Sequence, residues 1–173
     1  MRFLSQNIRQ VVMVLVLLIV AGCAKQEVTI ATAKQRPPGS TTTFDVYKSP
    51  SCGCCEEWIE HIEREGFSTN IHHPDDLNQL KITKGIAPSY QSCHTAITQH
   101  GYVFEGHVPA KFIQQFLVSP PPNAIGLAVP GMPLGSPGME MGDRFSSYQV
   151  LLLMADGSAK VFAEINSSQD QFD

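Results

Sequence analysis

The sequence predicts one α/β domain with a short sheet flanked by helices. Its 173 residues are enough for one ordinary hydrophobic core and too few for two once any processed segment is removed. With 43% apolar and 16% charged residues, the chain has the composition of a folded protein rather than a disordered one. From residue 44 onward, segments with strand periodicity alternate with segments of helical periodicity, which favours an α/β fold.

The first half of the predicted domain reads as strand, helix, strand and helix. Residues 44–48 alternate apolar and polar side chains, which is typical of a strand that enters a core. Residues 56–65 carry apolar side chains on one side and acidic ones on the other, and Gly66 follows as a helix end signal. Residues 67–71 predict a second strand, and residues 74–85 predict a short capped helix that closes at a glycine.

The second half adds a hairpin, a helix and further strands. The predicted hairpin turns at His100-Gly101, and Pro109 is well placed to begin the next helix. A loop rich in glycine, proline and methionine then precedes a final pair of strands joined by Asp156-Gly157. In chain order, the predicted segments are strands 95–98 and 101–105, helix 109–117, strand 125–129, loop 130–142, and strands 148–154 and 160–165.

The N-terminal 22 residues have the pattern of a signal peptide that is removed from the mature protein. Arg2 and Arg9 flank a short polar start, and an unbroken apolar run covers residues 11–21. This run is too short for a good membrane-spanning helix, which needs about 20 apolar residues. Removal of the two arginines would change the formal net charge from −4 to about −6. An acidic mature chain argues against nucleic acid as a partner, because phosphate binding needs a basic surface.

The signal ends in a sequence that resembles the lipobox of bacterial lipoproteins, Val20-Ala21-Gly22-Cys23. In a lipobox the cysteine is acylated and becomes the new N-terminus, so we expect lipid on Cys23; an ordinary secretory signal with a chance cysteine is the alternative. Because Ala24 and not aspartate follows, the lipoprotein sorting rule points to the outer membrane, with the domain facing the periplasm. The predicted organisation is a signal peptide (1–22), a lipidated tether (23–43), the folded domain (44–165) and a tail (166–173).

Three cysteines lie between the first predicted strand and the first predicted helix. Cys52 and Cys55 form a Cys-x-x-Cys pair, and Cys54 adds a third thiol between them. This placement resembles thioredoxin. Thiols at a helix N-terminus face unpaired backbone N–H groups and the positive end of the helix dipole, which stabilise thiolate. Three neighbouring thiolates repel one another, so a soft cation such as Cu(I) or Zn(II) is favoured; a disulfide plus one odd thiol is the alternative.

A second group of candidate ligands lies well away in the sequence. Cys93 and His94 are adjacent on a predicted strand or just before it, and they could complete the same site. His107 precedes a predicted helix, so it is either a further ligand or a residue that helps the helix begin. An ordinary hydrogen bond to the surrounding protein is the competing interpretation for both imidazoles. The remaining histidines have weaker claims: His61 on the exposed face of a helix, His72, His73 and His100.

The methionines outside the signal are concentrated in the predicted loop. Met132, Met139 and Met141 are surrounded by glycine and proline, which do not bury side chains by regular packing. Thioether ligation of copper is therefore an option for these three, and covering the edge of the core is the alternative. Met154 lies within a predicted strand, so we expect it in the core.

Four motifs in the same order resemble the CopG-like periplasmic metal-binding proteins, meaning the copper-resistance CopG and not the plasmid repressor of that name. They are Cys52-Gly53-Cys54-Cys55, Ser92-Cys93-His94-Thr95, Glu105-Gly106-His107-Val108-Pro109 and residues 130–140. The resemblance covers roughly residues 44–165. It implies a thioredoxin-like fold with a C-terminal extension rich in Met, Gly and Pro that contributes to a copper site, and a role in handling or redox conversion of copper in the cell envelope.

The residues and the resemblance together predict a copper-binding protein of copper resistance that faces the periplasm. Interconversion of Cu(I) and Cu(II), and with it a copper oxidoreductase activity, is left open, as is the number of copper ions. The expected partners are copper ions and either a copper efflux system or a periplasmic electron donor. Two alternatives are a thiol-disulfide oxidoreductase, which has no use for extra thiols and a methionine loop, and a zinc or general metal-storage module. The expected metal ligands are Cys52, Cys54, Cys55, Cys93, His94, His107, Met132, Met139 and Met141.

Overall fold

The structure of the protein, a computed structural model, describes residues 42–172. The predicted signal peptide, the predicted lipidation site Cys23 and all but the end of the predicted tether lie outside the described residues. Between residues 42 and 172, no helix is long and apolar enough to cross a membrane.

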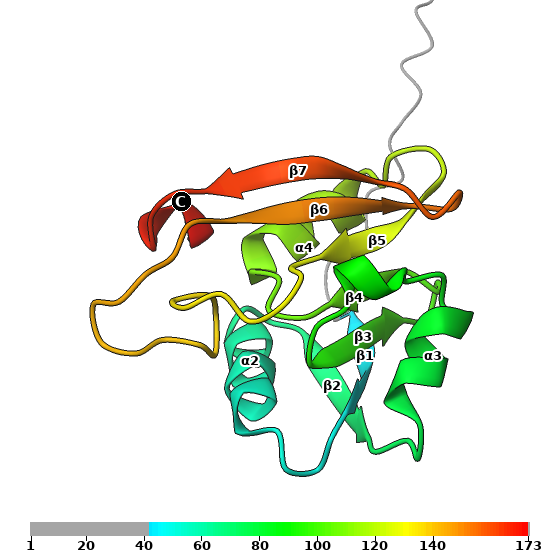
Figure 1. Cartoon of the computed structure of the whole chain (residues 1–173), viewed down its shortest axis with the longest axis horizontal. Coiled ribbons are helices and arrows are strands. Elements are labelled where there is room, and N and C mark those ends of the chain that lie inside the picture. The colour runs from blue at the N-terminus through cyan, green and yellow to red at the C-terminus, as the bar shows by residue number, and fades with distance from the viewer. Residues whose placement is uncertain (1–41, 173) are drawn as a thin grey trace, which may run out of the picture. The chain divides into compact units, whose positions relative to one another are not determined.

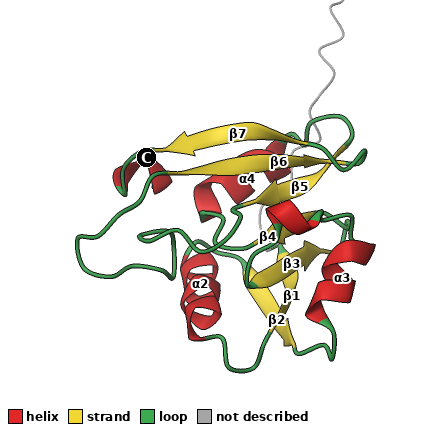
Figure 2. Ribbon diagram, viewed as in Figure 1, coloured by secondary structure: helices red, strands yellow, loops and turns green. Residues whose placement is uncertain are grey.

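Seven strands form one mixed sheet in the order β2-β1-β3-β4-β5-β6-β7 (Figure 1). β1 pairs with β2 in parallel, as β4 does with β5, and the other neighbours pair antiparallel. The strands are β1 (Thr43–Lys48), β2 (Ser68–His72), β3 (His94–Thr98), β4 (Val103–Glu105), β5 (Ala124–Ala128), β6 (Tyr148–Met154) and β7 (Ala159–Ile165). The helices, red in Figure 2, are α2 (Gly53–Arg64), α3 (Leu77–Thr83) and α4 (Ala110–Val118), with 3-10 turns at Pro88–Tyr90 and Gln169–Gln171.

Helices cover both faces of this sheet. α2 and α4 pack on one face, where Phe44, Trp58 and Phe116 belong to the main hydrophobic core. α3 lies on the other side of β1 and β3 (Figure 1), and its Leu80 packs on a smaller cluster that includes Ile97. Full burial of one such side chain contributes about 1.5–3 kcal/mol, so the main core fixes α2 firmly against the sheet.

The predicted α/β class and the predicted order of strands and helices are confirmed. The main difference is at α2, which begins at Gly53 and not at residue 56. Glycine and cysteine are poor helix formers, so the sequence alone underestimates this end. Cys55 is fully buried, and its packing in the core outweighs the low propensity. The predicted cap of α3 is confirmed as well, since the Asp76 carboxylate accepts a hydrogen bond from the Gln79 N–H at 2.8 Å.

The prediction that His61 lies on an exposed helix face is wrong. His61 is only 7% exposed, and its Nε2 accepts a hydrogen bond from the Ala110 N–H at 3.1 Å. α2 contacts both the sheet and the start of α4, so it buries a wider stripe than its apolar residues indicate. In α3, Lys81 is buried while Ile82 is exposed. Met154, expected in the core, is partly buried against it.

Candidate metal centre

The three cysteines after β1 lie at the N-terminal end of α2. The Cys52 N–H donates to Ser49 O at 3.1 Å, which turns the chain toward the helix, and α2 begins at Gly53. Cys54 and Cys55 are therefore in the first helical turn, where backbone N–H groups lack partners within the helix and the helix dipole is positive. Sulfur ligands at this position suit the binding of a soft cation.

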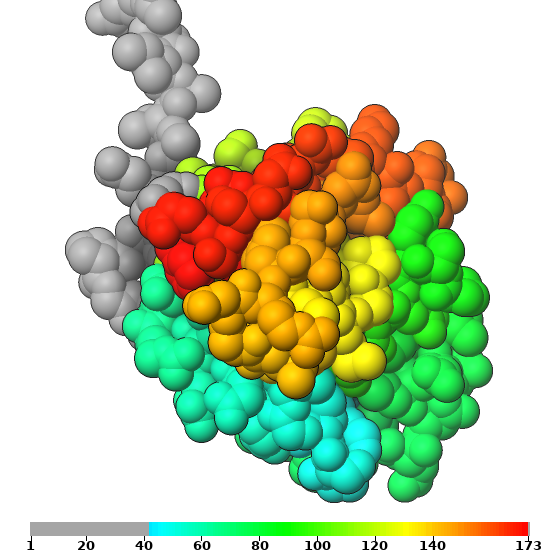
Figure 3. All heavy atoms as spheres, turned by 60° about the vertical axis from the view of Figure 1, so that its left-hand side comes forward, coloured from blue at the N-terminus to red at the C-terminus, as the bar shows by residue number. Residues whose placement is uncertain are grey.

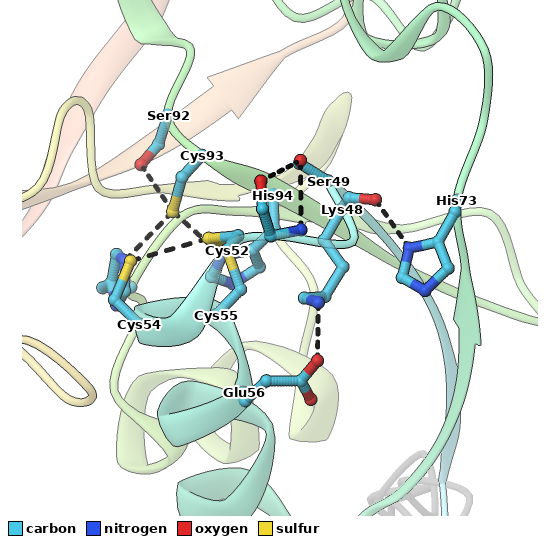
Figure 4. Close-up of a disulfide and its surroundings, with 12 residues drawn as sticks. Lys48, Ser49, Cys52, Cys54, Cys55, Glu56, His73, Ser92, Cys93 and His94 are labelled. Atoms are coloured by element: carbon cyan, nitrogen blue, oxygen red, sulfur yellow. Dashed lines mark hydrogen bonds and ion pairs between the residues drawn. A yellow bond between two sulfur atoms is a disulfide. The ribbon is translucent and has the colours of Figure 1, made fainter.

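An ion pair ties this turn to the sheet. The Lys48 side chain is buried at the end of β1, and its Nζ donates to Glu56 Oε1 at 2.6 Å (Figure 4). Because Lys48 ends the strand and Glu56 lies in the first turn of α2, the segment between them is held at both ends. The cysteines of this segment are thus kept in a defined place.

Cys93 approaches the same place from the neighbouring strand. β3 runs antiparallel to β1 with His94 opposite Lys48, so the residue before β3 lies beside the turn that follows β1. Figure 4 shows Cys93 facing Cys52 and Cys54. The sulfur atoms of all four cysteines in the two motifs lie within 4.8 Å of one another. The fold therefore brings together thiols that are about 40 residues apart in the sequence.

Two of these four cysteines form a disulfide. The sulfurs of Cys52 and Cys55 are bonded, and the Cys54 sulfur lies 3.6 Å from that of Cys52 (Figure 4). Of the cysteines among residues 42–172, Cys54 and Cys93 are free. The structure thus holds the oxidised pair that the sequence left open as an alternative. Four thiolates become available at this site only when the bond is reduced.

Two imidazoles contact the Cys93 sulfur. His107 Nε2 lies 3.0 Å from it, and His94 Nδ1 lies 3.3 Å from it. His107 Nδ1 donates to Pro137 O at 2.7 Å, so the lone pair of this ring is on Nε2 and faces the sulfur. Within the described part of the chain, His94 Nε2 is a buried nitrogen with no hydrogen-bond partner. Cys93, His94 and His107 therefore form a second group with the spacing of metal ligands, joined to the first through Cys93.

Burial sets the protonation state of these groups. It raises the pKa of the Cys93 thiol to about 12, and the neighbouring Cys54 adds to the shift. It also lowers the pKa of His107, and it lowers the pKa of His94 well below its usual value, with His107 contributing. In the metal-free protein at neutral pH, Cys93 is thus a neutral thiol beside two neutral imidazoles. A soft cation that binds there must displace the thiol proton, whereas the imidazoles are already in their ligating form.

Trp58 is a neighbour of this site that the sequence did not mark as functional. Its ring centroid lies 4.3 Å from that of His94, and its Nε1–H donates to Val108 O at 2.9 Å. It therefore supports one imidazole directly and fixes the backbone next to His107. The apolar periodicity of α2 predicted that Trp58 is buried, but this contact depends on the pairing of β1 with β3, which periodicity does not reveal.

The methionine-rich segment after β5 packs against the first turn of α2. Figure 3 shows its orange atoms beside the teal atoms of that region. Gly138 has a φ of +83°, and a Cβ there would lie 2.7 Å from Cys54 O, so only glycine permits this approach. Met139 follows and is partly buried, whereas Met132 and Met141 are 53% and 54% exposed. The backbone of the segment thus reaches the cysteines, and two of its three candidate thioether ligands lie at the surface.

The other histidines are held elsewhere. His72 Nε2 pairs with Asp45 Oδ1 at 2.8 Å, and His73 Nδ1 lies 3.0 Å from Lys48 O. His100 is exposed in the turn between β3 and β4. Their weaker claims as ligands of the cysteine site agree with these positions.

Comparison with known proteins gives the family. Residues 90–139 match a family described as protein of unknown function, DUF411. No curated protein matches the chain. One similar solved structure, described as copper resistance protein CopG, form 2, is 43% identical, covers 73% of this chain and 99% of its own, and has a TM-score of 0.69. Form 1 of copper resistance protein CopG is 44% identical, with coverage of 73% and 98% and a TM-score of 0.68.

The likeness extends over nearly the whole length of both solved chains and includes the sequence as well as the fold. This chain also has a cysteine cluster with the geometry of a metal site. This chain therefore belongs to the CopG family of copper resistance proteins.

Proposed function

We propose that this protein binds copper ions in copper resistance, at the site formed by its four clustered cysteines with His94 and His107. The main support for this proposal is that the four sulfurs lie within 4.8 Å of one another while the Cys93 sulfur contacts both imidazoles. Thiolate and imidazole donors suit copper and zinc and do not suit hard cations such as Mg²⁺ or Ca²⁺. The copper-resistance relatives support copper over zinc as the cargo.

Reduction of the disulfide controls how many sulfurs can bind. Two electrons and two protons convert the Cys52–Cys55 bond into two thiols, and a dithiol reductant or an electron donor of the cell envelope would supply them. Copper then displaces the thiol protons. In the oxidised protein, Cys54 and Cys93 are the free thiols of the cluster, so copper binding should be weaker and lower in stoichiometry.

The same pair can act as an electron source for copper. When the thiols of Cys52 and Cys55 form one disulfide, two electrons and two protons leave, and two Cu(II) ions each accept one electron to become Cu(I). Thiolate donors from Cys54 and Cys93 favour the Cu(I) product, and imidazole donors keep Cu(II) accessible. We therefore infer that the site interconverts Cu(I) and Cu(II), with the disulfide as the oxidised state of the protein.

In this proposal, the three methionines of the loop either bind copper through their thioether sulfurs or cover the copper site. Met139 is the best placed, because it follows Gly138, which lies against Cys54. Met132 and Met141 are more than half exposed, so they are suited to contact copper as it arrives or leaves. Replacement of all three by Leu should retain the fold and change the reduction potential of bound copper, read by voltammetry, with Met154→Leu as the control.

The Cys52–Cys55 disulfide also favours a second candidate function, thiol–disulfide exchange. The order β2-β1-β3-β4, with α2 and α4 on one face and α3 on the other, supports a thioredoxin-like arrangement for this part of the chain. An exchange enzyme needs the attacking thiol and its resolving partner only. Loss of Cys54 or Cys93 should therefore leave exchange intact and should impair copper binding.

For the cellular location, we propose a lipid anchor on Cys23 in the outer membrane, with the domain facing the periplasm. The lipobox-like sequence and the following Ala24 support this proposal. Copper ions are the proposed cargo. An efflux system that removes copper, or an electron donor of the periplasm, is the proposed macromolecular partner.

Metal analysis tests the proposed function. The full-length protein, reduced and loaded anaerobically with Cu(I), should hold copper, and Cys54→Ser and Cys93→Ser should each hold less. Ser51→Ala is the matched control, because Ser51 lies in the same turn and contributes no sulfur. Full copper content in both cysteine variants would leave only a thioredoxin-like pair. Preference for zinc over copper in direct competition would favour the storage alternative.

A further inference from the structure

A buried carboxylate lies on the face of the sheet opposite α2. Glu105 ends β4 and is fully buried. Its Oε1 accepts hydrogen bonds from Lys81 Nζ and, at 2.6 Å, from the Ser92 N–H. Its Oε2 accepts a hydrogen bond from Thr95 Oγ1 at 2.6 Å. The carboxylate is thus shared by α3, β3 and the segment that carries Cys93.

The hydrogen-bond donors around Glu105 explain why a carboxylate occupies this buried position. Three groups donate to Glu105, and an ionised carboxylate accepts from all of them without offering a donor of its own. Lys81 is buried as well, and its Nζ also donates to Thr95 Oγ1 at 3.1 Å. Neither charge would be stable here alone, because an unpaired buried charge is costly, so each requires the other.

The contacts of Glu105 join the two segments that supply the Cys93–His107 pair. Ser92 directly precedes Cys93, and Glu105 lies two residues before His107. Between them, the Gly106 N–H donates to the carbonyl of His94 at 2.9 Å. Gly106 has a φ of +71°, and a Cβ there would lie 2.5 Å from the Ser92 side chain, so the two segments are as close as their backbones allow.

We propose that Glu105 is a positioning residue of the metal centre, which holds Cys93 against His107 through the Ser92 N–H, with Lys81 as its buried counter-charge. Glu105 does not touch the sulfurs; it acts through the backbone on the far side of the sheet. The 3.0 Å separation between the Cys93 sulfur and His107 Nε2 is the geometry that it maintains. The effect of Glu105 on copper binding rests on the function proposed above, but the positioning of Cys93 by Glu105 does not.

Double variants test the proposal, because a single replacement would leave one buried charge without its partner. Lys81→Met with Glu105→Gln removes both charges and keeps a carbonyl oxygen that can accept from the Ser92 N–H. Lys81→Met with Glu105→Leu removes both charges and this acceptor. Leu153→Ala, in β6 and two strands along the sheet from Glu105 in β4, is the control for lost stability.

Two measurements on the full-length protein separate positioning from general stability. The first is Cu(I) affinity in competition with a chromogenic chelator, after reduction. The Glu105→Leu double variant should bind about tenfold or more weakly, as expected for a lost supporting contact, while the Glu105→Gln double variant and Leu153→Ala should bind like wild type. The second is the alkylation rate of each thiol in the metal-free, disulfide-containing protein, read by peptide mass spectrometry.

Alkylation gives an internal control. In the Glu105→Leu double variant Cys93 should react several-fold faster, whereas Cys54, which α2 holds, should react at its wild-type rate. Equal rates for Cys93 in the two double variants would overturn the proposal, as would an equal loss of copper affinity in Leu153→Ala. If the wild-type protein bound no copper, the proposed function would fail, and the alkylation rates would still decide whether Glu105 positions Cys93.

Discussion

At the scale of single residues, His61 couples protonation to the contact between α2 and α4. Burial lowers its pKa from 6.5 to about 4, and Arg64 adds to the shift. The neutral ring accepts the hydrogen bond of the Ala110 N–H, and a protonated ring cannot. The unfolded chain takes up this proton at a higher pH than the folded chain does. The neutral His61 ring therefore makes its full contribution to the free energy of unfolding above about pH 6.5, and this contribution is lost as the pH falls toward 4.

We predict that His61→Gln flattens this part of the pH profile. The glutamine carbonyl can accept from the Ala110 N–H but does not titrate. Between pH 6.5 and pH 4 the wild type should lose about 3 kcal/mol more free energy of unfolding than the variant. Urea unfolding across this pH range measures the difference. His94 and His107 titrate in both proteins, so an equal loss in the two would assign the effect to them and not to His61.

The sequence revealed the residues whose chemistry is unusual and missed those that act through packing. Spacing and residue type single out the cysteines and His94, because few other roles explain three thiols in four residues. Glu105 and Lys81 look like ordinary charged residues, since their burial follows from the pairing of β3 with β4 and from the position of α3. The prediction of an exposed His61 is wrong for the same reason, because the burial of His61 depends on a helix that is about 50 residues further along the chain.

At the scale of elements, the methionine-rich segment is held against α2 at Gly138. Gly138→Ala should be destabilising for two reasons: a left-handed φ, which costs about 1–2 kcal/mol, and overlap of the new Cβ with the backbone of α2, which costs about 1–3 kcal/mol more. The segment should lift from the cysteines and copper affinity should fall. Thermal unfolding and chelator competition measure the two effects.

Gly142→Ala is the matched control for this prediction. Gly142 lies in the same segment with a φ of +61°, but a Cβ there meets no atom within 4 Å. This variant should show the backbone cost alone and should bind copper as the wild type does. If both glycine variants behave alike, the contact of Gly138 with α2 is not what holds the segment.

Most elements could be predicted because their hydrophobic periods are regular and their ends carry glycine, proline or aspartate. The start of α2 could not, because its first turn is made of residues with low helix propensity that are held by the buried Cys55 and by the Lys48–Glu56 ion pair. The order of the seven strands also depends on contacts between distant segments. Periodicity identifies the strands but does not say which neighbour each one takes.

At the scale of the whole molecule, the proposed anchor would place the copper site at a membrane surface. Cys23→Ser should abolish lipidation, so the protein should become soluble in the periplasm or stay unprocessed. Fractionation of the cell envelope and the mass of the mature N-terminus measure the outcome. Wild-type recovery of the variant from the outer membrane, at the mature size, would contradict the proposal of a lipid anchor.

The whole fold also places different tasks on the two faces of the sheet. The clustered sulfurs lie at the N-terminal end of α2, and His94 contacts Trp58 of the same helix, whereas the Lys81–Glu105 pair that supports the site joins α3 to β4. A ligand set assembled from β1, α2, β3 and the segment after β4 forms only when the sheet is complete. Copper binding should therefore stabilise the folded protein, by an amount that grows with the concentration of free copper.

X-ray absorption spectroscopy at the copper edge, on reduced full-length protein loaded anaerobically with Cu(I), tests the central claim most directly. The account predicts a first coordination shell dominated by sulfur, with a smaller nitrogen contribution from imidazole, and a loss of sulfur ligands in Cys93→Ser. Copper with only nitrogen and oxygen ligands, or a spectrum that Cys93→Ser leaves unchanged, would contradict a copper site built on the four clustered cysteines.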